Sequence, residues 1–196
     1  MKKQITYIIL DFEATCCDDD SFPKSEREII EFGVVAVDGS SLIALAEFEA
    51  FVKPIRRHVL TKFCTELTTI TQEDVSGAKG FVAVLKEFAQ WLAQFENPLF
   101  CSWGLYDKIQ LMLDCVYHGV DYPFDEQHVN LKNEFSAVNG IRKNLGMKKA
   151  LARANVTLEG THHRGIDDAR NMVKLLPYIF GNKRVAVQHH RQGKKR

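Results

Sequence analysis

Two acidic residues, Asp11 and Glu13, stand one residue apart where an apolar run of the sequence ends. Alternate residues of a β-strand project to the same side, so we expect the two carboxylates to lie side by side at the rim of a sheet. Like charges that close together disfavour ionisation of both groups unless a cation lies between them. The pair therefore predicts a metal site, although solvated acids that follow a strand would show the same pattern.

Two further carboxylates accompany later elements of the chain. Asp107 and Asp168 each lie in the first turn of an expected helix. An acid in that position also stabilises the helix dipole, and each residue taken singly has this simpler explanation. Together with Asp11 and Glu13 they would supply four oxygen ligands, which suit Mg²⁺ or Mn²⁺ better than zinc.

A histidine, His163, precedes Asp168 by five residues in the loop before the last expected helix. Histidine titrates near neutral pH, so it can accept a proton from an attacking water, whereas carboxylates are weaker bases and are committed to the cations. Its neighbour His162 is a competing assignment for this role. Four carboxylates and one histidine predict a two-metal hydrolytic site.

The elements that must position these residues follow from periodicity and turn signals. Strands are expected over residues 5–11, 29–37, 42–52, 98–103 and 128–131. Helices are expected after Thr61, a candidate N-cap, and over residues 79–95, 105–117, 132–139, 147–154 and 166–180, the last kinked or ended near Pro177. This order predicts an α/β fold with a central five-stranded mixed sheet, the first three strands antiparallel, and helices on both faces.

Composition favours one domain with a charged end. The 196 residues are 45% hydrophobic, enough for a single core over residues 1–182. Residues 183–196 contain six Lys or Arg and no acid, so a disordered basic tail that attracts phosphate is expected there, although many such tails are only solvated. Five cysteines without CxxC spacing predict reduced thiols in a cytoplasmic protein. Neither a signal peptide nor a membrane-spanning segment is expected.

The five chemical residues, in this order, resemble the catalytic set of the DEDDh 3′-5′ exonucleases, which have the ribonuclease H-like fold. The set maps to Asp11, Glu13, Asp107, His163 and Asp168. Other motifs resemble the subgroup that includes the histone-mRNA 3′-end exonuclease and its bacterial relatives: DFEATC, the Leu-Thr-x-Ile-Thr run that ends at Thr71, SWGLYD and HRGIDDARN. The motifs span residues 8 to about 176. Two positions depart from the subgroup and leave substrate preference open: Thr69 replaces a usual glycine, and Leu105 replaces a residue that is often polar.

The resemblance implies a 3′-5′ exonuclease that acts on single-stranded RNA, with DNA as a further substrate, and releases nucleoside 5′-monophosphates. Two Mg²⁺ or Mn²⁺ ions would be held by the four carboxylates, with Asp11 shared by both ions and His163 as general base. Phe63 and Tyr106 would stack on the terminal base, although Phe63 could equally be a core residue, and the backbone near Thr15 would hold the terminal sugar. A short-oligonucleotide hydrolase and a catalytically silent nucleic-acid-binding module are the alternatives. The sequence does not indicate an oligomeric state.

Overall fold

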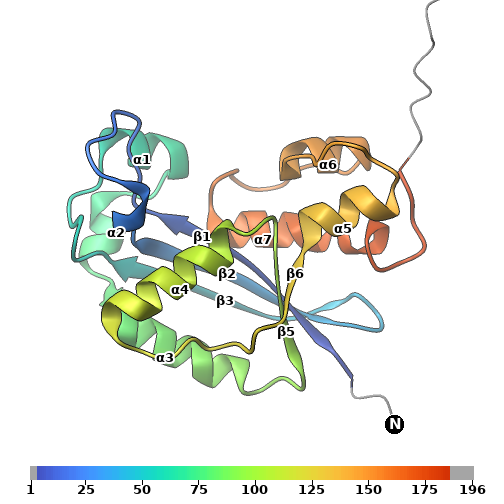
Figure 1. Ribbon diagram of the computed structural model, residues 1–196, viewed down its shortest axis with the longest axis horizontal. Helices are drawn as coiled ribbons and strands as arrows, with labels where there is room; N and C mark the ends of the chain where they lie inside the picture. The colour runs from blue at the N-terminus through green and yellow to red at the C-terminus, as the bar shows by residue number, and fades with distance from the viewer. Residues whose placement is uncertain (1–3, 186–196) are drawn as a thin grey trace, which may run out of the picture.

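The computed structural model describes residues 4–185, and its centre is a six-stranded sheet with strand order β4-β3-β2-β1-β5-β6 (Figure 1). The strands are β1 (Thr6–Ala14), β2 (Ile29–Asp38), β3 (Ala44–Lys53), β4 (Lys79–Gly80), β5 (Pro98–Ser102) and β6 (His128–Asn130). β1, β2 and β3 are mutually antiparallel, whereas β5 pairs parallel with β1, and β6 parallel with β5. The predicted mixed sheet with three antiparallel strands is confirmed.

The predicted number of five strands is wrong by one. β4 consists of two residues that pair with Val52 and Lys53 of β3, and the sequence analysis had placed Lys79 at the start of a helix. A two-residue strand is too short to produce an alternating hydrophobic pattern, so periodicity cannot detect it. The helix begins at Phe81, after Gly80 in an extended conformation.

Helices cover both faces of the sheet, as predicted. They are α1 (Lys62–Thr68), α2 (Gln72–Ser76), α3 (Phe81–Leu92), α4 (Tyr106–His118), α5 (Leu131–Val138), α6 (Met147–Arg153) and α7 (Gly165–Val173). Figure 1 shows α3 and α4 grouped together, away from α5, α6 and α7. The central strand β1 serves both groups: Ile8 and Leu10 pack with α3 and α4, whereas Ile9 packs with α5, α6 and α7. All three side chains are fully buried, which explains the continuous apolar run in the sequence.

Three local boundaries differ from expectation. β1 continues to Ala14, so Asp11 and Glu13 lie within the strand, and Glu13 is paired with Glu31 of β2. α7 ends at Val173 rather than near residue 180, and Pro177 lies in a separate 3₁₀ turn, Leu176–Tyr178. A short helix, α2, follows α1 and was not expected. It is stabilised by a capping box that links Thr71 and Asp74.

The capping residues of α1 explain one unusual position in the sequence. The predicted N-cap is confirmed, because the Thr61 side chain accepts a hydrogen bond from the backbone N–H of Cys64. At the other end, Thr69 is the C-cap and has φ of 63°, in the left-handed region. Glycine adopts that region without steric cost, which accounts for the glycine that similar sequences carry at this position.

Val185 marks the end of the described chain and packs against the body of the protein. Its side chain is 7% exposed, and its backbone N–H donates to the side chain of Asn139. The rest of the predicted basic tail, from residue 186, lies outside the described residues.

Two observations bear on the predicted location. Within residues 4–185, no helix combines the length and apolar character needed to cross a membrane. The five cysteines are free thiols. The cytoplasmic location stays a prediction.

Candidate active site

All five residues of the predicted catalytic set line one pocket of about 340 Å³. Asp11 and Glu13 come from β1, Asp107 from the first turn of α4, Asp168 from the first turn of α7, and His163 from the loop before α7. The remaining lining residues are Phe12, Trp103, Tyr106, Gly146, Met147 and His162. The fold therefore brings together side chains that are up to 157 residues apart, since 168 − 11 = 157.

Three of the carboxylates are close enough to share a cation. One oxygen each from Asp11, Glu13 and Asp168 can be chosen so that all lie within 4.8 Å of one another. Asp11 and Glu13 are on the same side of β1, as the alternation of a strand requires. Asp168 is added by the helix that crosses this strand.

A contact between two glycines lets α7 approach the sheet this closely. A methyl group on Gly33 of β2 would lie 1.9 Å from the carbonyl carbon of Gly165, and one on Gly165 would lie 2.8 Å from the carbonyl oxygen of Asp11. Neither separation is possible for a real side chain. The absence of side chains at both positions therefore allows the first turn of α7 to lie directly on β1 and β2, which places Asp168 beside Asp11.

Asp107 is held by the backbone of β1. The N–H of Phe12, the residue between Asp11 and Glu13, donates a 3.0 Å hydrogen bond to Oδ1 of Asp107. The side chain of Phe12 points the other way and packs in the core with α3 and α4, as alternation predicts. This bond fixes the start of α4 relative to the strand that carries the other two acids.

Burial and mutual repulsion disfavour the ionised carboxylates. Burial raises the pKa of Glu13 to about 9, with further contributions from Glu31 and Asp168. Burial also raises the pKa of Asp11 well above its usual value, helped by Asp107, and raises that of Asp107 to about 6 despite the hydrogen bond from Phe12. Among the described residues that line the pocket, none is a lysine or an arginine.

This donor set fits divalent cations. Hard ions such as Mg²⁺ and Mn²⁺ prefer carboxylate oxygens, and the pocket concentrates four carboxylates without a basic side chain to neutralise them. Structural acids of this kind are normally paired with arginine or lysine when buried. A cation would supply the missing positive charge.

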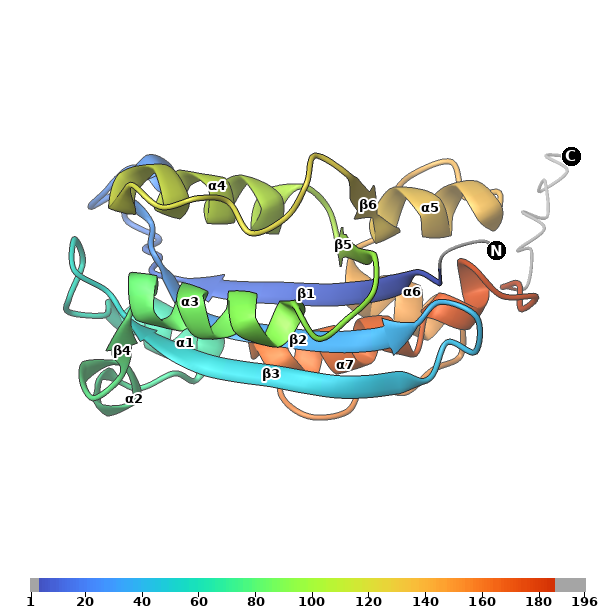
Figure 2. The ribbon, with the colours of Figure 1, turned by 90° about the horizontal axis from the view of Figure 1, so that it is seen from below.

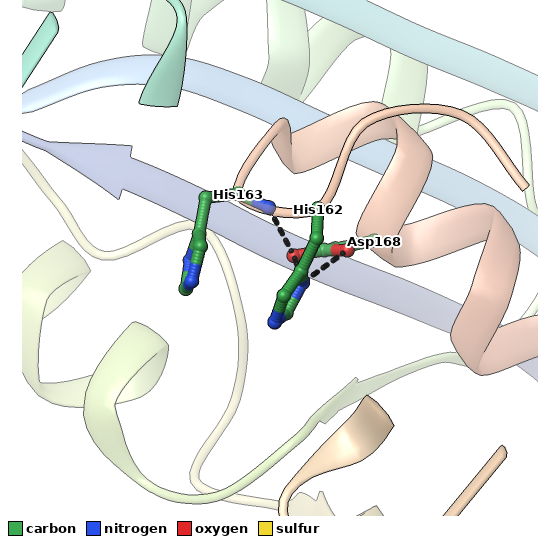
Figure 3. Close-up of side chains that lie close together, drawn as sticks. All are labelled: His162, His163 and Asp168. Atoms are coloured by element: carbon green, nitrogen blue, oxygen red, sulfur yellow. Dashed lines mark hydrogen bonds and ion pairs between the residues drawn. The ribbon is translucent and has the colours of Figure 1, made fainter. Parts of the chain in front are cut away.

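Two neighbouring histidines lie beside Asp168 (Figure 3). Nδ1 of His162 is 3.0 Å from Oδ2 of Asp168, and the backbone N–H of His163 donates to the same oxygen at 3.0 Å. The two imidazole rings stack with their centroids 4.0 Å apart. Burial, and then the neighbouring His162, lowers the pKa of His163, so this ring is neutral near pH 7. Both histidines line the pocket, and the geometry leaves both available to a substrate.

The structure adds two residues that the sequence analysis missed, Glu31 and Arg164. Glu31 is fully buried on β2 and accepts hydrogen bonds from the backbone N–H of Gly165, at 2.9 Å, and from Nη2 of Arg164, at 3.1 Å. These bonds anchor the start of α7 to the sheet. An acid inside the otherwise apolar run IIEFGVV was the available signal, because such a residue needs a buried partner.

The three predicted substrate-binding residues are placed differently. Tyr106 lines the pocket and is 43% exposed. Phe63 packs against a separate cluster that includes Cys16, Cys64 and Ile70, and Thr15 is buried, where its hydroxyl accepts a hydrogen bond from the backbone N–H of Glu28. Neither Phe63 nor Thr15 is among the lining residues, and their contacts with substrate stay predictions.

Comparison with known proteins identifies relatives over most of the chain. The exonuclease family model, RNase_T, matches residues 8–176. ERI1 exoribonuclease 3 of Homo sapiens is 34% identical over 181 residues, which cover 87% of this chain and 52% of the relative, so the chain spans about half the length of that protein. The probable 3′-5′ exonuclease KapD of Bacillus subtilis (strain 168) is 29% identical over 177 residues, which cover 90% of this chain and 85% of KapD.

A solved structure agrees with these relatives. The nuclease domain of 3'hExo, a DEDDh family member bound to rAMP, superposes with a TM-score of 0.77 at 25% identity, covering 94% of this chain and 97% of that domain. Exonucleases of this kind normally use divalent metal ions, in accord with the carboxylate pocket. The chain thus belongs to the exonuclease family, as a member of its DEDDh 3′-5′ group.

Proposed function

We propose that this protein is a metal-dependent 3′-5′ exonuclease that hydrolyses single-stranded RNA and releases nucleoside 5′-monophosphates. The observation that carries the proposal is the convergence of Asp11, Glu13, Asp107 and Asp168 on one pocket beside two histidines. The names of two relatives support RNA as substrate, since one is an exoribonuclease and a solved neighbour holds a ribonucleotide.

The four carboxylates would hold two Mg²⁺ or Mn²⁺ ions, with Asp11 shared between them. When bound, such ions offset the charge of the carboxylates and stabilise the negative charge that develops on the phosphodiester during hydrolysis. Asp107 and Asp168 contribute from separate helices, and each is fixed before substrate arrives. The hydrogen bond from Phe12 holds Asp107, and the contact of Gly33 with Gly165 holds α7 in place.

His163 is the proposed general base. Its lowered pKa keeps the imidazole neutral at physiological pH, the form that accepts a proton from the attacking water. The bond from its backbone N–H to Asp168 sets the position of the loop, and the stacked ring of His162 restricts the side chain. Tyr106 is the proposed stacking surface for the terminal base, because its half-exposed ring borders the pocket.

Replacement of His163 separates its role from that of its neighbour. We expect His163→Ala to reduce the hydrolysis rate by about 10²- to 10⁴-fold, because general base catalysis is lost. Mn²⁺ affinity, measured by calorimetry, should change little. His162→Ala is the matched control and should cost less activity. If His162→Ala alone produced the full loss, the general base would be reassigned to His162.

The activity can be tested with the purified chain, Mn²⁺ and 5′-labelled substrates. We expect single-stranded RNA to shorten stepwise from its 3′ end, and EDTA to stop the reaction. Single-stranded DNA and a dinucleotide serve as comparison substrates. Cleavage of DNA alone would overturn the RNA assignment, and cleavage of the dinucleotide alone would favour a short-oligonucleotide hydrolase. If no substrate were degraded, the proposal of an enzyme would be wrong.

A further inference from the structure

Helix α4 carries apolar side chains on its outer face as well as on the face that packs on the sheet. Leu111 and Cys115 are buried in the core. The outer face presents a row of six large apolar residues, here called the outer stripe: Leu105, Ile109, Met112, Leu113, Val116 and Tyr117. Each is at least 40% exposed, and Val116 reaches 80%. In Figure 2, α4 lies along the upper edge of the molecule.

The outer stripe carries no charge. Asp107 and Asp114, the two acids of α4, are turned inward and are 5% and 1% exposed. Lys108 lies to one side, where its ammonium donates to the backbone oxygen of Glu126. A helix that is apolar on all sides is normally buried in a larger assembly. The stripe also has no basic side chain to attract a phosphate backbone, which argues against nucleic acid as its ligand.

The size of the stripe is close to that of an interface between proteins. Large side chains carry roughly 150–250 Å² of surface, so six that are about half exposed offer on the order of 600 Å². That value is at the upper limit of the apolar patches on monomeric proteins, and a stable complex buries about 800 Å² per partner. Helix packing with a small contribution from the flanks would supply the difference.

We propose that a second copy of this chain covers the outer stripe, with the two α4 helices packed antiparallel across a two-fold axis. Such an axis requires one surface to be complementary to itself, which an uncharged apolar row satisfies without like-charge repulsion. Leu105, Ile109, Met112 and Val116 follow the three- and four-residue spacing of helix packing. The eleven residues beyond Val185 are a poor alternative cover, because only Ala186 and Val187 among them are apolar.

The proposed interface lies next to the active site. Leu105, the first residue of the outer stripe, directly precedes Tyr106, which lines the pocket. In an antiparallel pair the end of one α4 lies beside the start of the other. Val116 and Tyr117 of the second copy would therefore border the mouth of the pocket, and each protomer would contribute to the entrance of both sites.

The oligomeric state tests this proposal independently of catalysis. We expect sedimentation velocity of the full chain, over about 1 to 100 μM, to give twice the mass of the 22.4 kDa chain. Val116→Glu should yield monomers, because it places a charge in the centre of an apolar contact. Ile43→Glu, at a 64% exposed position outside α4, is the matched control and should remain dimeric.

The possible outcomes separate the occupants of the stripe. Thermal melts of both variants should match the wild type, since both positions are exposed, so a monomeric Val116→Glu protein would be folded. A wild-type chain that stays monomeric at every concentration, or a dimeric Val116→Glu protein, would overturn the proposal. A monomer whose affinity for single-stranded RNA falls in Val116→Glu would overturn it in favour of a nucleic-acid surface.

Discussion

Asp11→Asn is expected to abolish hydrolysis and, in the absence of metal, to raise the melting temperature. Loss of a carboxylate shared by two cations removes several kcal/mol of transition-state stabilisation, so the rate should fall at least about 10³-fold. The same carboxylate is unfavourable without cations, because burial and Asp107 raise its pKa well above the usual value. The neutral amide avoids the cost of ionisation in this pocket.

The pH dependence of the metal-free protein gives the sign of this effect. A carboxyl whose pKa is raised on folding stabilises the folded state at low pH, and that contribution is lost as pH rises from the unfolded value of about 4 through the folded value. In EDTA, the advantage of Asp11→Asn should therefore be large at pH 8 and vanish toward pH 4. Thermal melts across this range measure it.

The control removes an acid of the same type from an exposed position. Asp121→Asn should change neither the rate nor the melting temperature. Addition of Mn²⁺ should stabilise the wild type more than Asp11→Asn, because the variant has lost a ligand. Hydrolysis at a wild-type rate by purified Asp11→Asn would contradict the proposed mechanism.

Gly33→Ala is expected to lower the free energy of unfolding by at least about 3 kcal/mol, since a forced overlap in a packed region can exceed the usual cost of overpacking. Its methyl group would lie 1.9 Å from the carbonyl carbon of Gly165, and backbone atoms cannot rotate away as a flexible side chain can. The start of α7 must therefore move from the sheet. Urea unfolding followed by circular dichroism measures the change.

A glycine without close neighbours provides the comparison. A methyl group on Gly80 would have no neighbouring atom within 4 Å, and this residue has φ of −70°, so Gly80→Ala should change the free energy of unfolding by less than about 1 kcal/mol. If Gly33→Ala were as stable as Gly80→Ala, the close approach of α7 to the sheet would not be what limits this position.

The sequence was sufficient to predict the pocket because its ligands lie at the ends of regular elements. Asp11 and Glu13 follow the alternation of a strand, and Asp107 and Asp168 lie in first helical turns. These relations are local and repeat in many proteins. The α/β architecture was predicted for the same reason, since long periodic segments such as residues 81–92 identify their own type.

Long-range contacts set what the sequence did not reveal. The two-residue β4 exists only because β3 offers it a pairing edge, and the role of Glu31 depends on Arg164, which is 133 residues away. The orientation of the histidines has a similar origin. His163 has φ of 67°, and the bond of its backbone to Asp168 stabilises a conformation that local preference disfavours.

The contact of Gly33 with Gly165 offers a way to recognise lost activity in other sequences. Copies of an enzyme gene that no longer serve catalysis are usually identified by missing ligands. Here the geometry of the pocket also requires two residues that never touch a substrate. A chain that keeps all five chemical side chains but carries bulky residues at both glycine positions could not bring its last acid to the first strand, and genome surveys would do well to screen for that pair.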